Sequence, residues 1–211
     1  MSDERFRDVL ALAGPVSRET FDRLCAFEQA FLKWAGQINL VSAASLEKIW
    51  QRHIVDSIQL LPLAPFALRW ADLGSGGGFP GLPLAILLKE RPGASIDLVE
   101  SNRRKAGFLQ AMIGQFDLPA RVHPIRIEDA VGRLETPDIV TARALAPLSD
   151  LFRLSEPWLS TKSNSLFHKG RDFQSELRES SLSWDFDLVE HRSNSDTEGV
   201  ILEVSNLRRL F

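Results

Sequence analysis

The segment DLGSGGGFPG at residues 72–81 constrains this chain more than any other feature, because it places a cluster of glycines between an apolar run and a hydrophobic segment. Residues 69–73 are predicted as a buried strand and residues 81–88 as a helix. Gly74, Gly76 and Gly78 allow a tight turn and bring the backbone close to a ligand. Strand, glycine loop and helix form the first half of a βαβ unit, which binds ligands beyond the carboxyl end of its strand. The sequence therefore predicts a nucleotide cofactor site.

The glycine spacing fits two classes of cofactor. Gly76, Gly78 and Gly81 satisfy GxGxxG, the dinucleotide fingerprint. The alternative pattern DxGxGxG runs from Asp72 through Gly74, Gly76 and Gly78 and places an acid at the end of the strand. Such an acid organises the turn or meets the positive end of a ligand, a role that has no counterpart in binding pyrophosphate at a helix N-terminus. This second register favours S-adenosyl-L-methionine.

Glu100 is the second predicted cofactor-binding residue. It ends the apolar run 95–100, which is predicted as the next strand. A carboxylate at the end of the second strand accepts hydrogen bonds from both hydroxyls of a ribose. Both classes of cofactor contain that ribose, so Glu100 supports a nucleoside ligand without separating methyl transfer from hydride transfer.

Composition indicates an ordinary globular protein. The chain has 211 residues, 44% of them hydrophobic and 25% charged, and its net charge of −3 argues against a uniformly basic nucleic-acid-binding protein. A single cysteine, Cys25, excludes an internal disulfide framework and a cysteine cluster for metal. The start of the sequence has no apolar run of the kind found in a leader, and no segment is long and apolar enough to span a membrane. We expect a monomeric cytoplasmic protein without a metal site.

The order of predicted elements indicates two parts, an N-terminal helical cap over residues 1–66 and a core over residues 67–211. Helices are predicted at 17–35, with Ser17 as its N-cap, and at 46–61. On the second helix His53 lies among apolar neighbours, and a packed core histidine is its more frequent role. Arg52 and Asp56 are four residues apart and are predicted to pair on the surface of that helix.

Strands and helices alternate through most of the core, which predicts a parallel sheet. The predicted strands are 69–73, 95–100, 121–125 and 137–142, and the predicted helices are 81–91, 103–116 and 146–158. Three strands follow at 165–168, 185–191 and 199–204, and the short polar link between the last two permits a hairpin but no parallel crossover. The predicted fold is α/β, a Rossmann-like class I methyltransferase fold with a mostly parallel doubly wound sheet that ends in an antiparallel strand.

With these elements placed, the sequence resembles the bacterial 16S rRNA guanine-N7 methyltransferases, the glucose-inhibited division protein B family. The resemblance covers most of the chain, and the order and spacing of its motifs are more specific than any motif alone. The motifs are INLVSA at 38–43, RHIVDS at 52–57, DLGSGGGFPGLPLAI at 72–86, LVESNRRKAGFL at 98–109, RIEDA at 126–130, VTARALAPL at 140–148 and HKGR at 168–171.

The resemblance implies an enzyme that methylates one guanine of 16S rRNA with S-adenosyl-L-methionine. By resemblance, the cofactor site includes Gly74, Phe79, Ile127, Glu128 and Arg143, in addition to the Asp72, Gly76 and Glu100 of the glycine loop and second strand. Arg143 suits either the carboxylate of the methionine portion or an RNA phosphate, and the sequence does not choose between them.

The implied chemistry needs no general base, because guanine N7 has an in-plane lone pair and no proton to lose. Alignment of the reacting atoms and exclusion of water are sufficient contributions. The sequence accordingly predicts no catalytic acid or base. N7 faces the major groove, which is too narrow for side chains in A-form RNA, so the target is expected to be unpaired or distorted.

RNA contacts are predicted from position and charge at the motifs RHIVDS and HKGR, namely Arg52, His53, Lys169 and Arg171. The partner would be 16S rRNA or the small ribosomal subunit. Two other functions stay open at this point. One is a methyltransferase that acts on a small molecule with the same cofactor, and the other is an NAD-binding dehydrogenase.

Overall fold

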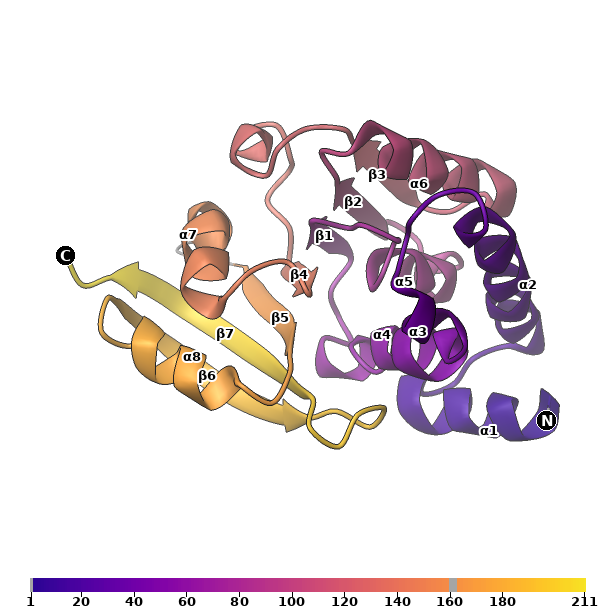
Figure 1. The fold of residues 1–211 in the computed structure, drawn as a ribbon, viewed down its shortest axis with the longest axis horizontal. Coiled ribbons are helices and arrows are strands. Elements are labelled where there is room, and N and C mark those ends of the chain that lie inside the picture. Colours follow the sequence, from indigo (N-terminus) through magenta and orange to yellow (C-terminus); the bar gives the residue numbers. More distant parts are fainter. Residues whose placement is uncertain (1, 160–162) are drawn as a thin grey trace.

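The computed structural model describes residues 2–159 and 163–211 and contains a seven-stranded sheet in the order β3-β2-β1-β4-β5-β7-β6 (Figure 1). The first five strands are parallel to one another. They are β1 (Arg69–Leu73), β2 (Ser95–Val99), β3 (Ala120–His123), β4 (Ile139–Arg143) and β5 (Asn164–Lys169). The order reverses at β1, where β2 and β4 lie on its two sides, and this switch point is where such sheets bind ligands. The predicted parallel sheet is confirmed.

The sheet ends in a long hairpin made of β6 (Trp184–Arg192) and β7 (Val200–Arg209). Strand β7 runs antiparallel to both β5 and β6. The predicted hairpin and the predicted antiparallel strand are therefore confirmed. The loop between β6 and β7 reaches the N-terminal cap, because the backbone N–H of Asn194 donates to Oε1 of Gln59 at 2.8 Å.

Helices cover both faces of the sheet (Figure 1). One face packs against α2 (Arg18–Ala35), α5 (Gly81–Leu88) and α6 (Arg103–Phe116), and α7 (Leu148–Leu159) and α8 (Phe173–Ser180) lie on the other. Helix α2 begins where predicted, since Oγ of Ser17 accepts a hydrogen bond from the backbone N–H of Thr20 at 3.1 Å. Within residues 2–159 and 163–211, no helix combines the length and apolar character required to cross a bilayer.

The helix predicted at 46–61 is confirmed only in its middle, where the π-helical η1 (Trp50–Val55) continues directly into α4 (Asp56–Ile58). On either side the chain forms α3 (Ala43–Leu46) and the 3-10 helix η2 (Leu61–Leu63) instead. Apolar spacing alone does not distinguish a π turn from an α turn, and π turns are rare and frequently found at functional sites. The predicted surface pair of Arg52 with Asp56 does not form either, because the Asp56 carboxylate is buried and pairs elsewhere.

Two helices were not predicted, α1 (Ser2–Ala13) and α8. Both are short, and the tertiary contacts of a few side chains hold them in place. In α1, the Phe6 ring meets the Phe21 ring edge to face at 5.1 Å, and the guanidinium of Arg18 lies 4.3 Å from the centre of the Phe6 ring. Short helices depend on such packing rather than on their own propensity.

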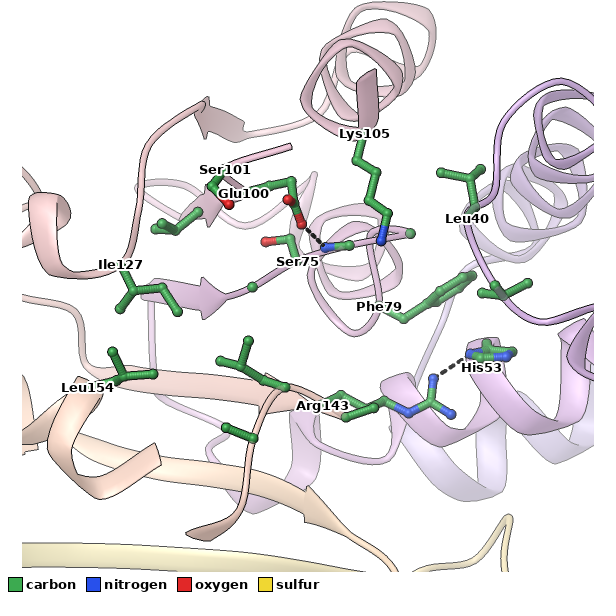
Figure 2. Close-up of a pocket in the computed structure, with 18 of the residues that line it drawn as sticks. Leu40, His53, Ser75, Phe79, Glu100, Ser101, Lys105, Ile127, Arg143 and Leu154 are labelled. Carbon is green, nitrogen blue, oxygen red and sulfur yellow. Dashed lines mark hydrogen bonds between the residues drawn. The ribbon is translucent and has the colours of Figure 1, made fainter. Parts of the chain in front are cut away.

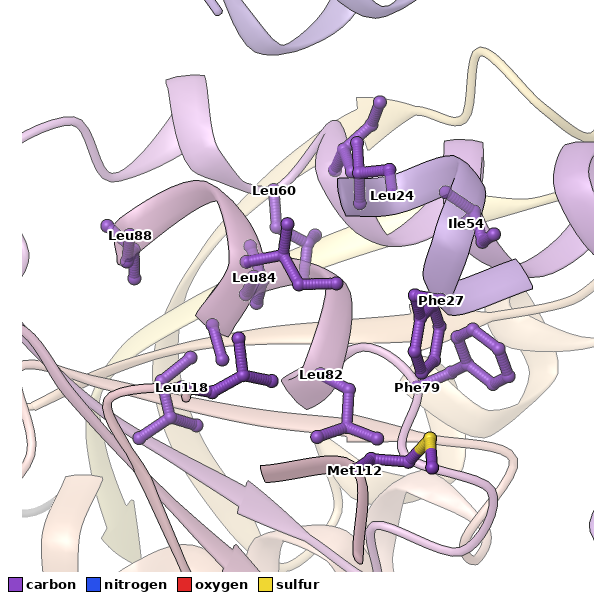
Figure 3. Close-up of a cluster of buried hydrophobic side chains, with 14 of the residues drawn as sticks. Leu24, Phe27, Ile54, Leu60, Phe79, Leu82, Leu84, Leu88, Met112 and Leu118 are labelled. Carbon is purple, nitrogen blue, oxygen red and sulfur yellow. The ribbon is translucent and has the colours of Figure 1, made fainter. Parts of the chain in front are cut away.

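The larger apolar cluster joins the cap to the sheet (Figure 3). Phe27 and Ile54 of the cap, Leu82 and Leu84 of α5 and Met112 of α6 belong to it. Burial of such side chains contributes roughly 1.5–3 kcal/mol each. The division into residues 1–66 and 67–211 stays a prediction, since both parts share this cluster. The shared packing fixes the cap over the end of the sheet where the glycine loop lies.

Candidate active site

The glycine loop follows β1 directly and turns through three left-handed glycines. Gly74, Gly76 and Gly78 have φ values of +67°, +54° and +86°. These are the three glycines of the DxGxGxG register, and a side chain is strained in that conformation. Gly81, the last glycine of the GxGxxG register, instead allows α5 to pack closely, because a Cβ there would lie 2.3 Å from Cδ2 of Leu98.

Glu100 lies directly against this loop (Figure 2). Its Oε2 accepts a hydrogen bond from the backbone N–H of Gly76 at 2.8 Å, and its Oε1 accepts one from that of Asn102 at 2.7 Å. A carboxylate accepts about four hydrogen bonds. The two N–H groups therefore hold the carboxylate in place and leave lone pairs for a pair of ligand hydroxyls.

These elements surround a cleft with a volume of about 760 Å³, within the range typical of small-molecule sites. Figure 2 shows Ile127 and Leu154 at one end of the cleft, His53 at the other, and Glu100 between them. The cleft brings together most residues predicted for the cofactor, namely Gly74, Gly76, Phe79, Glu100, Ile127, Glu128 and Arg143. Ile127 is buried and Glu128 is exposed, so they provide an apolar wall and a polar rim.

Asp72 does not line the cleft and requires a correction. Its side chain is buried, and its Oδ1 accepts a hydrogen bond from Oγ1 of Thr141 at 3.0 Å. A Cβ on Gly81 would lie 2.9 Å from Oδ2 of Asp72, which places the carboxylate beneath the start of α5. Burial raises the pKa of Asp72 to about 7, although the Thr141 hydroxyl acts in the opposite direction. Of the two predicted roles, the structure favours organising the turn over meeting the ligand.

Phe79 and His53 form the wall of the cleft that faces the cap. The Phe79 ring packs against the Phe31 ring at 5.1 Å and against the His53 ring at 4.9 Å. Burial, reinforced by the charge of Arg143, lowers the pKa of His53 to about 3. The imidazole is therefore neutral at pH 7, and its Nδ1 accepts from Nη1 of Arg143 at 2.5 Å. His53 therefore packs against an apolar ring, as predicted, and also lines the cleft.

Arg143, at the end of β4, is held by the cap through all three of its guanidinium nitrogens. Besides Nη1 on His53, its Nη2 donates to the backbone carbonyl oxygen of Arg52 at 2.5 Å, and its Nε lies 3.1 Å from Oδ2 of Asp56. Each terminal nitrogen of a guanidinium carries a second N–H. Arg143 therefore keeps donors for a ligand while its orientation is fixed by the protein.

Asp56 is the centre of a buried polar cluster that also includes His53, Arg143, His168, Gln59, Ser193 and Ser195. Oδ1 of Asp56 accepts from the hydroxyls of Ser195 and Ser193 and from the amide of Gln59. Burial acts to raise the pKa of Asp56, but His168, Arg143 and the serine hydroxyls outweigh it, so the pKa lies below its ordinary value. The cluster ties the cap, two strand ends and the β6–β7 loop together.

The four predicted RNA contacts differ in their surroundings. Arg52 is exposed at the rim of the cleft, and Arg171 is exposed with only a 3.6 Å contact to Glu198. His53 lines the cleft but packs against Phe79. Lys169 is the exception, since its Nζ lies 2.5 Å from Oε2 of Glu176 and its side chain is only 9% exposed. Lys169 is therefore an internal ion-pair partner, which corrects its prediction as a surface contact.

Several residues of the site were missed by the sequence reasoning. Lys105, Arg126 and Arg153 line the cleft and place positive charge around it, and only the first two lie within the motifs at 98–109 and 126–130. Asp56 lies within the motif at 52–57, and that was the available signal for it. Ser193 and Ser195 lie in a polar loop that gives no local sign of its contact with the cap.

The sheet order, the glycine loop and the acid that ends β2 define a Rossmann-like methyltransferase fold. Solved structures agree on that fold. Cofactor-bound Rv0187 from MTB matches with a TM-score of 0.60 at 15% identity, covering 97% of this chain and 96% of that one. A mutant of MtNAS in complex with S-adenosylmethionine matches with a TM-score of 0.57 at 16% identity, covering 87% of this chain and 74% of that one.

The chain belongs to the GidB family, described as rRNA small subunit methyltransferase G, which matches residues 21–201. Two relatives carry the name ribosomal RNA small subunit methyltransferase G. The protein of Chelativorans sp. (strain BNC1) is 54% identical over 210 residues, covering all of both chains. The protein of Brucella ovis is 56% identical over 208 residues, covering 99% of this chain and 98% of its own. The family predicted from the motifs is thus confirmed.

Proposed function

We propose that this protein transfers the methyl group of S-adenosyl-L-methionine to N7 of a guanine in 16S rRNA. The observation that carries the proposal is the pairing of Glu100 with the left-handed glycine loop at the floor of an open cleft. Family membership supplies the substrate class, since the matching family and relatives are named for the small-subunit RNA. The partner is 16S rRNA or the small ribosomal subunit, and the enzyme acts as a monomer in the cytoplasm.

The residues present fit this cofactor. Glu100 has lone pairs free for the ribose hydroxyls, and the left-handed turns at Gly74 and Gly76 keep Cβ atoms out of the space needed by the methionine portion. Ile127 and Glu128 offer an apolar wall and a polar edge for adenine. When bound, S-adenosyl-L-methionine supplies an electrophilic methyl group.

The chain's own contribution is to orient the reactants and to exclude water. Phe79 provides an apolar wall that is fixed by neighbouring rings, and Arg143 presents its remaining N–H groups from a guanidinium held by the cap. No proton must leave guanine N7, so the neutral imidazole of His53 is assigned the task of holding Arg143 and no acid–base role. Orientation and preorganised charge account for large parts of such rate enhancements.

Transfer of labelled methyl groups tests the proposal directly. The protein is incubated with labelled S-adenosyl-L-methionine and unmodified small subunits, naked 16S rRNA or free guanine nucleosides. Borohydride and aniline cleavage then maps N7-methylguanine. We expect one cleavage site in the RNA and little transfer to nucleosides. Transfer to nucleosides that equals transfer to RNA would instead support a methyltransferase that acts on small molecules.

Calorimetric titration separates the two classes of cofactor. We expect S-adenosylhomocysteine to bind in the cleft and NAD to give no heat. Loss of S-adenosylhomocysteine binding in Gly76→Val, where a branched side chain is forced on a left-handed residue, ties the heat to the glycine loop. Tight binding of NAD would favour a dehydrogenase and contradict the proposal.

The exposed arginines near the cleft are proposed to meet RNA phosphates. Removal of one such phosphate interaction should reduce the slope of log K against log salt by about 0.7–0.9. We expect Arg52→Ala and Arg171→Ala to weaken RNA binding and to reduce this slope. Arg7→Ala, which removes the same charge at an exposed position of α1 outside the cleft, is the matched control. Unchanged methylation rates and salt slopes in both arginine variants would remove these contacts from the proposal.

A further inference from the structure

A second cavity, with a volume of about 360 Å³, lies beside the main cleft. The two cavities share a border made of Asp56, Arg143, Ala144, Ala146 and Asp196. The far side of the second cavity is formed by the end of β5, by residues 168–172, and by the β6–β7 loop. A ligand that extends out of the main cleft past the end of β4 therefore enters this second space.

His168 lines the second cavity and has an unused acceptor. Its side chain is 7% exposed, and its Nε2 lies 2.9 Å from the backbone carbonyl oxygen of Asp56. A carbonyl oxygen only accepts, so Nε2 carries the hydrogen. Burial lowers the pKa of His168, which keeps the ring neutral and leaves a lone pair on Nδ1. That Nδ1 is buried and has no hydrogen-bond partner among residues 2–159 and 163–211. Buried acceptors are rarely left without a donor.

The charges of this cavity favour an uncharged ligand with N–H groups over a phosphate. The cations that line its interior already have acidic partners, since Arg143 pairs with Asp56 and Lys169 pairs with Glu176. Asp172 and Asp196 add negative charge. Arg171 has its side chain 73% exposed and makes only a 3.6 Å contact to Glu198, so it is available to a phosphate at the rim.

We propose that the second cavity holds the nucleobase next to the methylated guanine. A turn of the His168 ring that brings the buried Nδ1 to the cavity lets the amino or imino N–H of that base donate to it, and Arg171 meets the backbone phosphate. Proteins that recognise RNA commonly separate neighbouring bases of an unpaired segment and place each in its own pocket. This inference rests on the proposed function, because it assigns a second part of the same RNA substrate.

Filling the cavity tests the assignment. Gly170 lines the rim, and a Cβ built on it has no atom within 4 Å, so Gly170→Phe adds a ring at the cavity mouth without a clash. We expect KM for 16S rRNA to rise about ten-fold, the size expected when one base is no longer bound. The dissociation constant of S-adenosylhomocysteine should stay within about two-fold, as for an independent site. Gly114→Phe, on the exposed side of α6 with equal free space, is the matched control and should leave both constants unchanged.

Removing the base itself provides the second half of the test. 16S rRNA with an abasic site on the 5′ or the 3′ side of the target guanine is used as substrate. We expect one of the two to lower kcat/KM of the unaltered protein about ten-fold. The same RNA should lower the kcat/KM of Gly170→Phe by less than about two-fold, because the introduced ring already excludes the base. His168→Phe, which keeps a ring but removes the acceptor, should match Gly170→Phe if it retains S-adenosylhomocysteine binding.

The outcomes separate this inference from the function on which it rests. If the unaltered protein forms no N7-methylguanine in intact RNA, the proposed function fails and the subsite fails with it. If the unaltered protein methylates RNA but tolerates both abasic sites, the subsite alone is overturned. A Gly170→Phe protein that responds to the abasic site as strongly as the unaltered protein also overturns the subsite alone.

Discussion

The two ends of the main cleft are built in different ways. At the glycine-loop end, a contiguous stretch of chain and the neighbouring strand end make the site through backbone groups, as in the bond from Gly76 to Glu100. At the other end, side chains from the cap, β4, β5 and the β6–β7 loop meet around Asp56. The first end depends on local conformation, and the second depends on the whole fold being assembled.

The electrostatics of the two ends differ in the same way. Beneath the glycine loop, burial raises the pKa of Asp72 and favours its neutral form. In the cluster, Asp56 stays ionised despite its burial because the charge of Arg143 and the hydroxyls of Ser193 and Ser195 stabilise its carboxylate. A buried carboxylate without a cation takes up a proton, whereas one with a cation and hydrogen-bond donors does not. Charge pairing therefore stabilises the cluster, and packing stabilises the loop.

The largest expected effect is on the stability of the cluster. Arg143→Ala removes the cation that faces Asp56, and the two side chains are only 19% and 10% exposed. Removing one partner of a buried pair costs about 3–5 kcal/mol, because a charge is left uncompensated. We expect the free energy of unfolding, measured with urea, to fall by that amount.

The double variant Arg143→Ala with Asp56→Asn is the control for this prediction. It removes the stranded charge together with the cation and should recover part of the lost stability, which demonstrates coupling between the two residues. If the free energy of unfolding of Arg143→Ala equals that of the unaltered protein, the cluster does not stabilise the packing of the cap.

A smaller effect is expected at the loop end, mainly on binding. Glu100→Gln keeps the shape of the side chain but replaces one carboxylate oxygen by an NH2 group, so it loses a charged acceptor for the ribose hydroxyls and one of the two backbone hydrogen bonds to Gly76 and Asn102. Hydrogen bonds to charged groups contribute roughly 1.5–3 kcal/mol, or about ten- to a hundred-fold in affinity. We expect the dissociation constant of S-adenosylhomocysteine, measured by calorimetry, to rise by this factor. Glu135→Gln, at an exposed position outside the cleft, is the control, and equal affinities in the two variants would contradict the assignment of Glu100.

The same contrast between local conformation and distant contacts decides which features the sequence predicts. The glycine loop between a strand and a helix, the strand that ends next to Glu100 and the mostly parallel sheet were predicted correctly, because backbone conformation and apolar periodicity are encoded by neighbouring residues. Ser17 caps the N-terminus of α2 as predicted. These features need no knowledge of how distant segments meet.

The features that were predicted wrongly depend on distant contacts. Asp56 was assigned to Arg52, four residues away, but its partners Arg143 and Ser195 are supplied by β4 and the β6–β7 loop. Lys169 was assigned to RNA, but α8, which was not predicted, provides Glu176 as its partner. The apolar spacing over residues 46–61 predicts one α-helix, because spacing does not reveal the π turn at Trp50–Val55.

The two ends of the main cleft should contribute slopes of opposite sign to the pH dependence of the free energy of unfolding. The pKa of His53 is lowered from 6.5 to about 3, so between those pH values the unfolded chain binds a proton that the folded protein excludes. Its contribution therefore makes stability rise with pH in that window. The pKa of Asp72 is raised from 3.8 to about 7, so the folded protein holds the extra proton, and its contribution makes stability fall as pH rises. Each slope is at most about 1.4 kcal/mol per pH unit.

Variants that remove each group test this pair of slopes. Between pH 4 and 6, about the window that both shifts share, His53→Phe should make unfolding stability rise less with pH, and Asp72→Asn should make it rise more. His191→Gln, on β6, controls for loss of an imidazole outside the site. Urea titrations at a series of pH values provide the measurement. Slopes that change in the same direction in both variants would refute the contrast.

The smallest effect is expected for an ion pair that is shorter than the one in the cluster. Nη2 of Arg208 lies 2.6 Å from Oδ2 of Asp185, against 3.1 Å between Arg143 and Asp56, but these side chains are 73% and 51% exposed. Water already solvates both exposed charges, so such pairs contribute about 0–1 kcal/mol. We expect Arg208→Ala to lower the free energy of unfolding by no more than that in the urea titration used for Arg143→Ala. A loss comparable with that of Arg143→Ala would mean that distance rather than burial sets the strength of these pairs, and the special position of the cluster would disappear.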